Sequence, residues 1–306
     1  MKNILVIGGT GFIGSNIVKQ LLLQDYNISI LELPNFASPI LNAKIHYGKL
    51  EQLDFIKKII IEDSIDTVIH LASSLIPSSN LDEYLNEFEK VIKPTIELLS
   101  FLASSNIKIV YFSSGGTIYG VNEKGVFSES DNTNPISYYG QSKLILEQSI
   151  LLENRRLGLN YLIVRPSNPY GIGQNIFGKQ GFIAASIGHV LNNEKIAIWG
   201  DGSVIRDYIH IDDLVTGVIK LMQSGKSNEI YNIGSGSGYS VKEIINILKK
   251  CVSIDFESEY SEARAVDVPV MILEVTKIQE IIGSDQIPIE QGIMDFYNYE
   301  LLKNKS

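Results

Sequence analysis

Two residues four positions apart, Tyr139 and Lys143, carry the clearest signal for chemistry in this sequence. On a helix, this spacing places both side chains on one face, one turn apart. A nearby ammonium stabilises a phenolate, so a phenol whose pKa is ordinarily about 10 becomes a usable acid or base. The same pattern is common on ordinary helix surfaces, so it predicts catalysis only beside a cofactor site. Ser113 and Ser114, which end an upstream apolar segment, add hydroxyl groups at a predicted strand end.

A glycine-rich turn supplies the expected cofactor site. Gly8, Gly11 and Gly14 follow the apolar segment Ile4–Ile7 and open an amphipathic segment. Glycines allow a tight turn and a close approach of the backbone to a pyrophosphate, and a helix N-terminus offers free N–H groups and a favourable dipole. A tight turn without a ligand is the plainer alternative, but the order of strand, glycines and helix favours dinucleotide binding.

Glu32 indicates which dinucleotide binds. It ends the second apolar segment, about 20 residues beyond the glycines, where a carboxylate can accept hydrogen bonds from both ribose hydroxyls of NAD. The same carboxylate would repel the 2′-phosphate of NADP, and residues 34–43 contain no arginine to hold that phosphate. We therefore expect NAD as the cofactor.

Alternating strands and helices must position these residues. Short segments rich in Ile and Val are typical of strands buried on both faces, and the amphipathic segments between them predict helices. The predicted strands are Ile4–Ile7, Ile28–Leu33, Thr67–Leu71, Ile107–Phe112 and Tyr161–Val164. The predicted helices are Gly11–Gln24, Leu53–Glu62, Leu81–Ser104 and Tyr138–Leu157. This order predicts an α/β fold with a Rossmann-type doubly wound parallel sheet.

Beyond Arg165 the pattern becomes irregular, and we expect a smaller C-terminal α+β domain. Its predicted elements are helices at Phe182–Leu191, Asp213–Met222 and Ser240–Lys250 and strands at Lys195–Trp199 and Glu229–Ile233. Ser240 followed three residues later by Glu243 is typical of a capping box. The expected domains are 1–166, with contributions from about 205–235, and 167–306.

Composition narrows the class of protein. The chain has 306 residues and a net charge of −9, which argues against a nucleic-acid-binding protein. A single cysteine, Cys251, cannot form an internal disulfide, and no run of about eighteen apolar residues predicts a membrane span. We therefore expect a cytoplasmic protein. The histidines are scattered without metal-ligand spacing, so no metal site is expected.

Taken together, a set of motifs resembles the extended short-chain dehydrogenases/reductases, and among them the NAD-dependent epimerase/dehydratase family that includes UDP-glucose 4-epimerases. The motifs are GGTGFIGS (8–15), DTVIHLA (66–72), SSGGTIYG (113–120), YGQSK (139–143), RPSNPYG (165–171), GDGSVIRDYIHIDD (200–213) and YNIGSGSGYS (231–240). They span nearly the whole chain, which makes the resemblance more specific than any one motif.

The resemblance implies roles for several residues. In this family the tyrosine and the lysine act with a Ser or Thr hydroxyl that bonds the reacting sugar oxygen. The usual position of that hydroxyl is Gly115 here, so Ser114 or Thr117 would supply it. The implied NAD contacts are Gly8, Gly11, Phe12, Ile13, Gly14, Glu32, Leu50, Leu71, Ala72, Ser73, Tyr139 and Lys143.

Two further positions depart from the family pattern. An Asp that commonly follows the third strand and contacts adenine is Lys49 here, and an Asn often presented to the cofactor from a helix is Val91. Both departures remove a usual cofactor contact.

On the substrate side, the resemblance implies a nucleotide-diphosphate sugar bound between the two domains, so that 167–306 is a nucleotide-sugar-binding domain. Asn168 would bond the diphosphate or sugar, and Arg206 and Arg264 would clamp the diphosphate with their planar guanidinium groups. Asp267 would face the nucleoside ribose. For each arginine, an ion pair with a neighbouring acidic residue on the surface is the plainer alternative.

Other polar residues are expected to be structural. Asp212 and Asp213 are expected to cap a helix, because acidic side chains accept hydrogen bonds at helix N-termini. His70 and His210 are expected to serve the fold, and Trp199 lines either the substrate pocket or the core.

The expected reaction is 4-epimerisation of a nucleotide sugar, in which Tyr139 takes the C4 hydroxyl proton while hydride moves to NAD and later returns to the opposite face. An NAD(P)H-dependent 4-keto-sugar reductase would use the same residues, although Glu32 disfavours NADPH. A 4,6-dehydratase is disfavoured because its Asp-Glu pair would fall on Gly116-Thr117.

A non-catalytic NAD-binding sensor with this fold is the remaining alternative, and the presence of both Tyr139 and Lys143 argues against it. A homodimer through 81–104 and 138–157 is implied by the resemblance.

Overall fold

The computed structural model describes residues 2–34, 42–178, 180–252, 254–262 and 268–304. At its centre lies a parallel sheet of seven strands in the order β11-β7-β5-β4-β1-β2-β3. The strands are β1 (Asn3–Ile7), β2 (Asn27–Glu32), β3 (Lys44–Tyr47), β4 (Thr67–His70), β5 (Lys108–Phe112), β7 (Tyr161–Pro166) and β11 (Glu229–Ile233). The strand order reverses between β1 and β4, which is where ligands bind in open α/β sheets.

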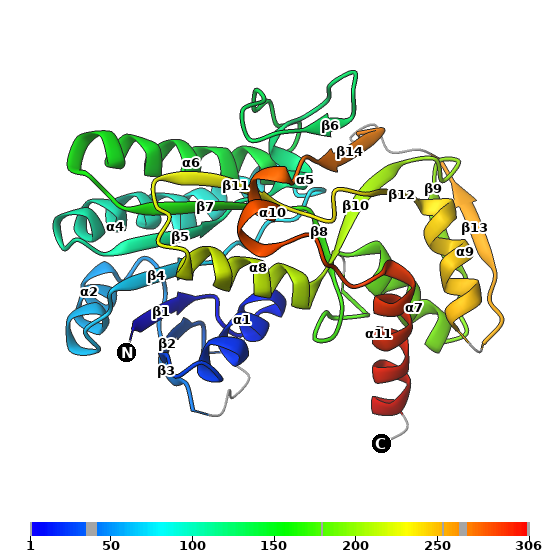
Figure 1. The fold of residues 1–306 in the computed structure, drawn as a ribbon, viewed down its shortest axis with the longest axis horizontal. Coiled ribbons are helices and arrows are strands. Elements are labelled where there is room, and N and C mark those ends of the chain that lie inside the picture. Colours follow the sequence, from blue (N-terminus) through cyan, green and yellow to red (C-terminus); the bar gives the residue numbers. More distant parts are fainter. Residues whose placement is uncertain (1, 35–41, 179, 253, 263–267, 305–306) are drawn as a thin grey trace.

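Helices cover both faces of this sheet (Figure 1). One face packs against α2 (Leu53–Glu62), α4 (Lys93–Ser104) and α6 (Tyr138–Leu157). The other face packs against α1 (Phe12–Leu22), α8 (Ile211–Gln223) and α10 (Thr276–Ile282). Because each strand is buried on both sides, its apolar residues run nearly without interruption.

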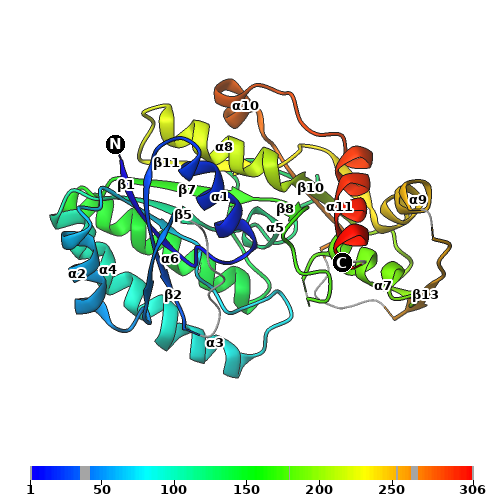
Figure 2. The ribbon, with the colours of Figure 1, turned by 90° about the horizontal axis from the view of Figure 1, so that it is seen from below.

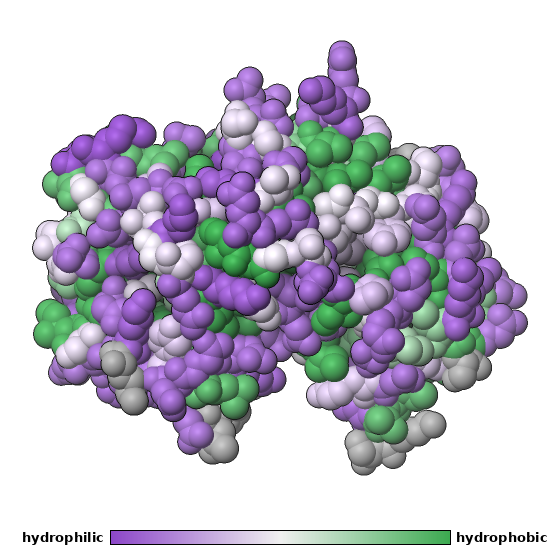
Figure 3. Space-filling view, in the orientation of Figure 1, coloured by the Kyte–Doolittle hydropathy of each residue, from purple (hydrophilic) through white to green (hydrophobic). Residues whose placement is uncertain are grey.

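A second lobe lies beyond the carboxyl ends of the central strands. It contains α7 (Phe182–Leu191), α9 (Val241–Cys251), α11 (Ile289–Lys303) and the paired strands β9 (Ile196–Trp199) and β13 (Ser258–Ser261). These helices enclose an apolar core of their own and are grouped together when the molecule is seen from below (Figure 2). In space-filling form the outline is notched between the two lobes, and hydrophilic residues cover most of the visible face (Figure 3).

A small mixed sheet joins the lobes. It consists of β6 (Val126–Phe127), β8 (Asn168–Tyr170), β10 (Ile205–His210), β12 (Gly238–Ser240) and β14 (Val270–Leu273). After β10 the chain returns to the first lobe through α8 and β11, and β11 pairs with β7. The second lobe is therefore attached to the central sheet by several crossings of the chain.

The structure confirms the predicted fold class and the capping box of α9, in which Ser240 and Glu243 bond reciprocally. The prediction that Asp212 and Asp213 cap a helix is wrong. Helix α8 begins at Ile211, and its N-cap is His210, whose Nδ1 accepts a hydrogen bond from the Asp212 backbone N–H at 3.3 Å.

The single helix predicted for 81–104 is also wrong in one respect. The segment consists of α3 (Leu81–Glu87), a π-helical turn η1 (Phe88–Ile92) and α4. The periodicity of apolar residues did not reveal the extra residue in this turn.

Candidate active site

The glycine turn lies where β1 enters α1. Gly14 must lack a side chain, because a β-carbon there would collide with the Gly8 carbonyl oxygen. A β-carbon on Gly11 would meet only that same oxygen, at 3.5 Å, so this side of the turn is open. Gly11 is the N-cap of α1 and makes no side-chain capping bond. An uncapped helix N-terminus beside an open glycine turn fits a phosphate group.

Glu32 faces this turn from the end of β2. Its Oε2 accepts hydrogen bonds from the Thr10 hydroxyl at 2.7 Å and the Thr10 backbone N–H at 3.2 Å. The carboxylate therefore lies beside the turn in three dimensions as well as at the predicted distance in sequence. This position fits a ribose whose pyrophosphate sits at the start of α1.

The segment after β4 lies next to the same turn. A β-carbon on Gly8 would be 3.2 Å from the Ala72 backbone nitrogen. The Ser73 hydroxyl accepts a hydrogen bond from the Leu75 backbone N–H at 3.3 Å. Leu71, Ala72 and Ser73 thus line the edge at which β1 and β4 end, while Leu50 is buried against α2 and its neighbours.

Phe12 and Ile13 form the first turn of α1 and are partly buried against the core that this helix shares with α8. The structure therefore brings the predicted cofactor contacts to the carboxyl edge of the sheet, around the point where the strand order reverses. Lys49 follows β3, and Val91 lies in η1.

Tyr139 and Lys143 occupy the first turns of α6, as predicted. The Lys143 ammonium is 5.6 Å from the centre of the Tyr139 ring and 5.5 Å from that of Tyr111. Lys143 is 4% exposed, so its positive charge is held within the protein. The Ser114 side chain lies near the Tyr139 hydroxyl, close enough to act on the pKa of the phenol.

Ser114 and Thr117 differ in their surroundings. Ser114 is the N-cap of the short helix α5 (Gly115–Ile118) and contacts Tyr139. The Thr117 hydroxyl is buried and has no hydrogen-bond partner in the described part of the chain. The approach of α5 to α6 requires Gly140, because a β-carbon there would lie 2.6 Å from the Thr117 carbonyl oxygen.

Burial away from water is the main cause of the pKa shifts of Tyr139 and Lys143. Burial raises the pKa of Tyr139, and the neighbouring Ser114 side chain opposes that rise. Burial lowers the pKa of Lys143 to about 8, although the negative charges of Glu87 and Glu147 act in the opposite direction. Lys143 therefore titrates closer to neutral pH than an ordinary lysine, whereas the phenol of Tyr139 stays protonated to higher pH than an ordinary tyrosine.

A buried network supports this helix from behind. Arg165 donates hydrogen bonds to both carboxylate oxygens of Glu147, at 2.9 and 2.6 Å, and one to the Tyr119 hydroxyl at 2.9 Å. The Tyr119 hydroxyl donates in turn to the Asn232 amide oxygen at 2.6 Å. Bidentate pairing fixes side chains in a defined geometry, so this network ties α6 to β7 and β11.

His70 lies inside the central sheet, where a residue that serves the fold is expected. It is fully buried in β4, and its Nε2 lies 2.9 Å from the Thr95 hydroxyl oxygen. Burial, together with the Lys143 charge, lowers the pKa of His70 to about 3. His70 therefore remains neutral near pH 7 and offers no proton to the site.

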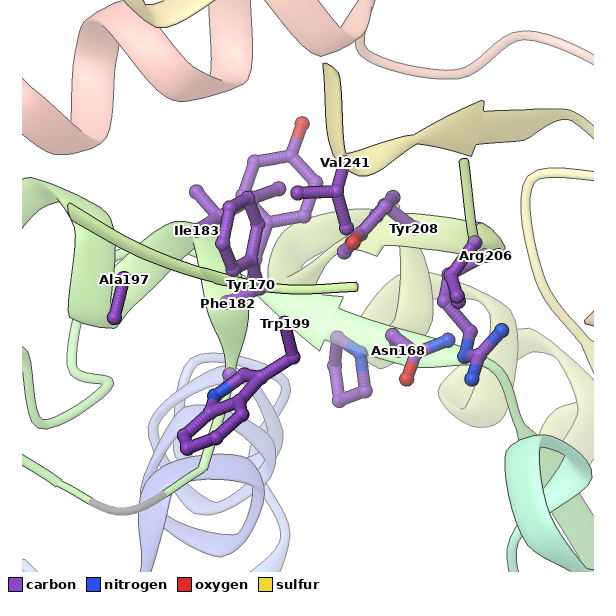
Figure 4. A pocket seen from close by; sticks show the side chains of 12 residues that line it. Asn168, Tyr170, Phe182, Ile183, Ala197, Trp199, Arg206, Tyr208 and Val241 are labelled. Carbon is purple, nitrogen blue, oxygen red and sulfur yellow. The ribbon is translucent and has the colours of Figure 1, made fainter. Parts of the chain in front are cut away.

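A cavity of about 220 Å³ opens in the second lobe beside the small sheet (Figure 4). Asn168 from β8 and Arg206 from β10 line it, and so does Trp199 at the end of β9. A β-carbon on Gly116 would be 3.7 Å from the Asn168 amide oxygen, so Asn168 connects this cavity with α5, whose N-cap is Ser114.

Polar contacts hold both substrate candidates in place. The Asn168 amide donates to the Asp207 carbonyl oxygen at 2.8 Å, and the Arg206 guanidinium donates to the Ile205 carbonyl oxygen at 2.9 Å. The Asp207 carboxylate is buried and accepts hydrogen bonds from Ser235. Arg264 and Asp267 lie outside the described residues.

Several residues in and around the candidate site were not predicted from the sequence. The aromatic side chains that line the cavity with Trp199 are Tyr170, Phe182 and Tyr208. Tyr170 and Tyr208 lie within motifs already noted in the sequence, and this position could have indicated that they line the site. Glu87, a buried carboxylate near Tyr139 and Lys143, had no such signal, because its position depends on the π-helical turn.

In the described ranges, no group of three His, Cys, Asp or Glu side chains comes together in a way that would hold a metal ion. None of the helices within those ranges combines the length and hydrophobicity that a bilayer crossing requires.

Comparison with known proteins agrees with this geometry. A UDP-glucose 4-epimerase of Halalkalibacterium halodurans is 30% identical over 92% of this chain and 89% of its own length. A dTDP-4-dehydro-6-deoxyglucose reductase of Escherichia coli is 32% identical over 81% of each chain. The crystal structure of UDP-glucose 4-epimerase from Thermotoga maritima with UDP-glucose superposes with a TM-score of 0.91 at 30% identity, covering 99% of each chain.

Residues 4–234 match the NAD dependent epimerase/dehydratase family. Together with the full-length relatives, this match shows that the chain belongs to the NAD-dependent epimerase/dehydratase family and is an enzyme that uses NAD.

Proposed function

We propose that this enzyme is a 4-epimerase of nucleotide-diphosphate sugars. The observation that carries the proposal is the position of the Ser114 and Tyr139 side chains. Ser114 follows the end of β5, at the same edge of the parallel sheet as the glycine turn after β1, and Asn168 of the cavity lies next to α5. The epimerases among its relatives match over nearly the full length of the chain.

In this proposal, Tyr139 takes the proton of the sugar C4 hydroxyl and later gives it back. Ser114 bonds the same sugar oxygen and holds it at the phenol. The Lys143 ammonium stabilises the phenolate across one helical turn. NAD held at the glycine turn would supply the hydride acceptor and donor for this exchange, so that no net oxidant would be consumed.

The cavity suits the nucleotide part of such a substrate. Aromatic rings offer stacking surfaces for a base, and the Arg206 guanidinium offers a planar fork for a diphosphate. We propose Asn168 and Arg206 as substrate-binding residues on these grounds. Arg264 and Asp267 remain proposed partners of the diphosphate and the ribose.

The cofactor contacts are proposed on the same basis. The open turn at Gly11, the uncapped start of α1 and the nearby Glu32 carboxylate fit a pyrophosphate followed by a ribose. Leu71, Ala72 and Ser73, at the end of β4, lie where a bound dinucleotide would pass from β2 toward α6.

Product analysis tests the reaction. The purified protein is incubated with UDP-, GDP-, CDP- and dTDP-hexoses without added coenzyme, and the products are followed by NMR. Formation of a C4 epimer supports the proposal. Turnover that requires a 4-keto sugar and stoichiometric NADH or NADPH contradicts it.

A 4-keto-sugar reductase is the second candidate, because one relative with 32% identity is a dTDP-4-dehydro-6-deoxyglucose reductase. The same NMR experiment separates the two reactions, since a reductase consumes reduced coenzyme at every turnover and an epimerase does not.

We also propose that the enzyme is a homodimer through α3, η1, α4 and α6. Several apolar side chains on this surface are exposed, namely Leu81 (49%), Leu85 (53%), Phe88 (37%) and Leu152 (45%). Exposed apolar side chains on neighbouring helices favour association with a complementary partner, and a second copy would offer the same side chains. Light scattering of the purified protein gives the oligomeric state, and a monomer would contradict this assignment.

A further inference from the structure

Glu87 is a buried carboxylate at the end of α3. Only 2% of it is exposed, although the preceding residues of this helix are exposed or half-buried. Its Oε2 accepts hydrogen bonds from the Ser74 backbone N–H at 2.9 Å and from the Ser74 hydroxyl at 2.6 Å. A buried carboxylate is costly unless its surroundings compensate the charge, so its presence calls for an explanation.

The π-helical turn accounts for how Glu87 becomes buried. The buried face of α4 continues back to Ile92. At ordinary helical spacing, Phe88 would be the next residue on that face, because it precedes Ile92 by four. In the π-helical turn, however, Lys93 donates its backbone N–H to Phe88, five residues earlier. Glu87 therefore lies on the inner face, and Phe88 is 37% exposed.

This exchange opposes the hydrophobic effect. An aromatic residue faces outward while the carboxylate next to it faces inward. Single π-helical turns inside helices occur frequently at functional sites, where the extra residue changes which side chain faces inward. Here the side chain brought inward is an ionisable group beside the site.

Contacts fix this carboxylate relative to α6. Tyr84, three residues before Glu87, stacks on Tyr138 with ring centres 5.1 Å apart. Tyr138 immediately precedes Tyr139, so α3 is held against the first turn of α6. On its other side, Glu87 holds Ser74, which directly follows the Ala72 and Ser73 positions at the end of β4.

The charged and titratable groups at this place come from four elements. His70 comes from β4, Tyr111 from β5, Glu87 from α3, and Tyr139, Lys143 and Glu147 from α6. Burial raises the pKa of Tyr139 and lowers that of Lys143, whereas the negative charge of Glu87 acts to raise both pKa values. His70 stays neutral, because its pKa is about 3. The fixed negative charges that act on Lys143 are therefore those of Glu87 and Glu147.

We propose that Glu87 is a positioning residue for the reaction at Tyr139. Its carboxylate holds the segment after β4 through Ser74, and its negative charge favours the protonated forms of Lys143 and Tyr139. This inference rests on the proposed role of Tyr139 in proton transfer, and it does not depend on which nucleotide sugar is the substrate.

Removal of the charge at constant size tests the proposal. Glu87→Gln retains an oxygen that accepts both hydrogen bonds from Ser74, but it carries no charge. We expect the loss of kcat/KM on the alkaline side to begin at lower pH in this variant, because Lys143 gives up its proton more readily. Glu89→Gln is the matched control, since Glu89 lies two residues further along, is exposed and pairs with Lys93 at 3.3 Å. A decrease in activity without a shift of the pH profile would overturn the proposal and leave Glu87 a structural residue.

A titration without turnover separates this inference from the proposed reaction. Phenolate absorbance is measured against pH in the NAD-loaded protein, and the Tyr139 contribution is obtained by subtracting the matching Tyr139→Phe variant. The midpoint of Tyr139 should move to lower pH in Glu87→Gln and stay in place in Glu89→Gln. An unchanged midpoint overturns the role of Glu87 even if epimerisation is observed, and a lowered midpoint supports it even if the reaction proves to be a reduction.

Glu87→Asp covers the case in which the glutamine variant does not fold. The side chain of aspartate is one methylene group shorter, so its carboxylate lies farther from Tyr139 and Lys143. We then expect the Tyr139 midpoint to move in the same direction by a smaller amount. An unchanged midpoint in a folded Glu87→Asp protein contradicts the proposal.

Discussion

The Lys143 ammonium donates a hydrogen bond to the Phe112 carbonyl oxygen at 3.0 Å, and so joins α6 to the carboxyl end of β5. Ser113 and Ser114 follow Phe112 directly, and Tyr139 lies one turn before Lys143. One lysine therefore anchors the helix that carries the phenol to the strand end that carries the serine. The distance between Ser114 and Tyr139 is set by this contact, by Gly140 and by the network around Arg165.

Tyr139→Phe should abolish turnover while NAD binding is largely kept. The substitution removes the only atom that exchanges a proton in the proposed reaction, and general acid–base catalysis typically contributes about 10²- to 10⁴-fold. Turnover is measured by NMR, and NAD binding is measured by calorimetry. Unchanged turnover would exclude the proposed mechanism, and a loss of NAD binding would mean that Tyr139 acts mainly in the cofactor site.

Two substitutions, Ser114→Ala and Thr117→Val, test which hydroxyl takes part in the proposed reaction at Tyr139. Ser114 lies beside Tyr139, whereas the Thr117 hydroxyl is buried without a described partner. We expect Ser114→Ala to lower kcat by about 10- to 100-fold and Thr117→Val, which keeps the side-chain shape, to leave it nearly unchanged. The reverse order of effects in steady-state kinetics would assign the hydroxyl to Thr117.

The pH dependence of kcat/KM should reflect Lys143. Because burial lowers the pKa of Lys143 to about 8, the ammonium is present below that pH and is lost above it. We expect kcat/KM, which reports on the free enzyme, to decline above about pH 8. Lys143→Met should be nearly inactive, and Lys93→Met, at an exposed position on α4, should keep the wild-type profile. A profile that is flat up to pH 10 would contradict the role of this ammonium.

Asp63 should contribute to stability at neutral pH but not in strong acid. Burial alone would raise the pKa of Asp63, but hydrogen bonds from Lys44, Ser29 and His46 outweigh it and lower the pKa to about 2. The contribution is therefore complete above the ordinary value near 3.8 and is lost as the pH falls toward 2.

Urea unfolding of Asp63→Asn measures this contribution. We expect the free energy of unfolding at pH 7 to fall by about 1 to 2 kcal/mol, with a smaller difference from wild type at pH 2 to 3. Asp54→Asn is the control, because Asp54 is fully exposed and its nearest ammonium lies 3.8 Å away. Equal losses of stability at both pH values would show that the carboxylate charge is not the cause.

Local patterns in the sequence determined much of this molecule. The order of strand, glycine turn and helix predicts the start of a dinucleotide fold, since each step is a short-range consequence of backbone geometry. The spacing of Tyr139 and Lys143 predicts that they share a helix face, and buried strands are recognisable from continuous apolar segments. The capping box at Ser240 is equally local, and the structure contains it.

Other features depended on contacts between segments far apart in the sequence. The N-cap of α8 is His210, two to three residues before the acidic residues that the sequence suggested, because α8 begins directly after β10. Ser114 and Tyr139 are neighbours only because α5 packs on α6.

Glu87 shows most clearly which structural features could not be predicted from the sequence. In the sequence it is one acidic residue of an amphipathic helix. Hydrophobicity alone predicts that the neighbouring phenylalanine, and not the glutamate, is buried. A single π-helical hydrogen bond rotates the helix before it and brings the carboxylate inward. Sequence periodicity determined that a helix is present here. The π-helical turn, with the contacts of α3 to α6 and to Ser74, decided which of its side chains faces inward.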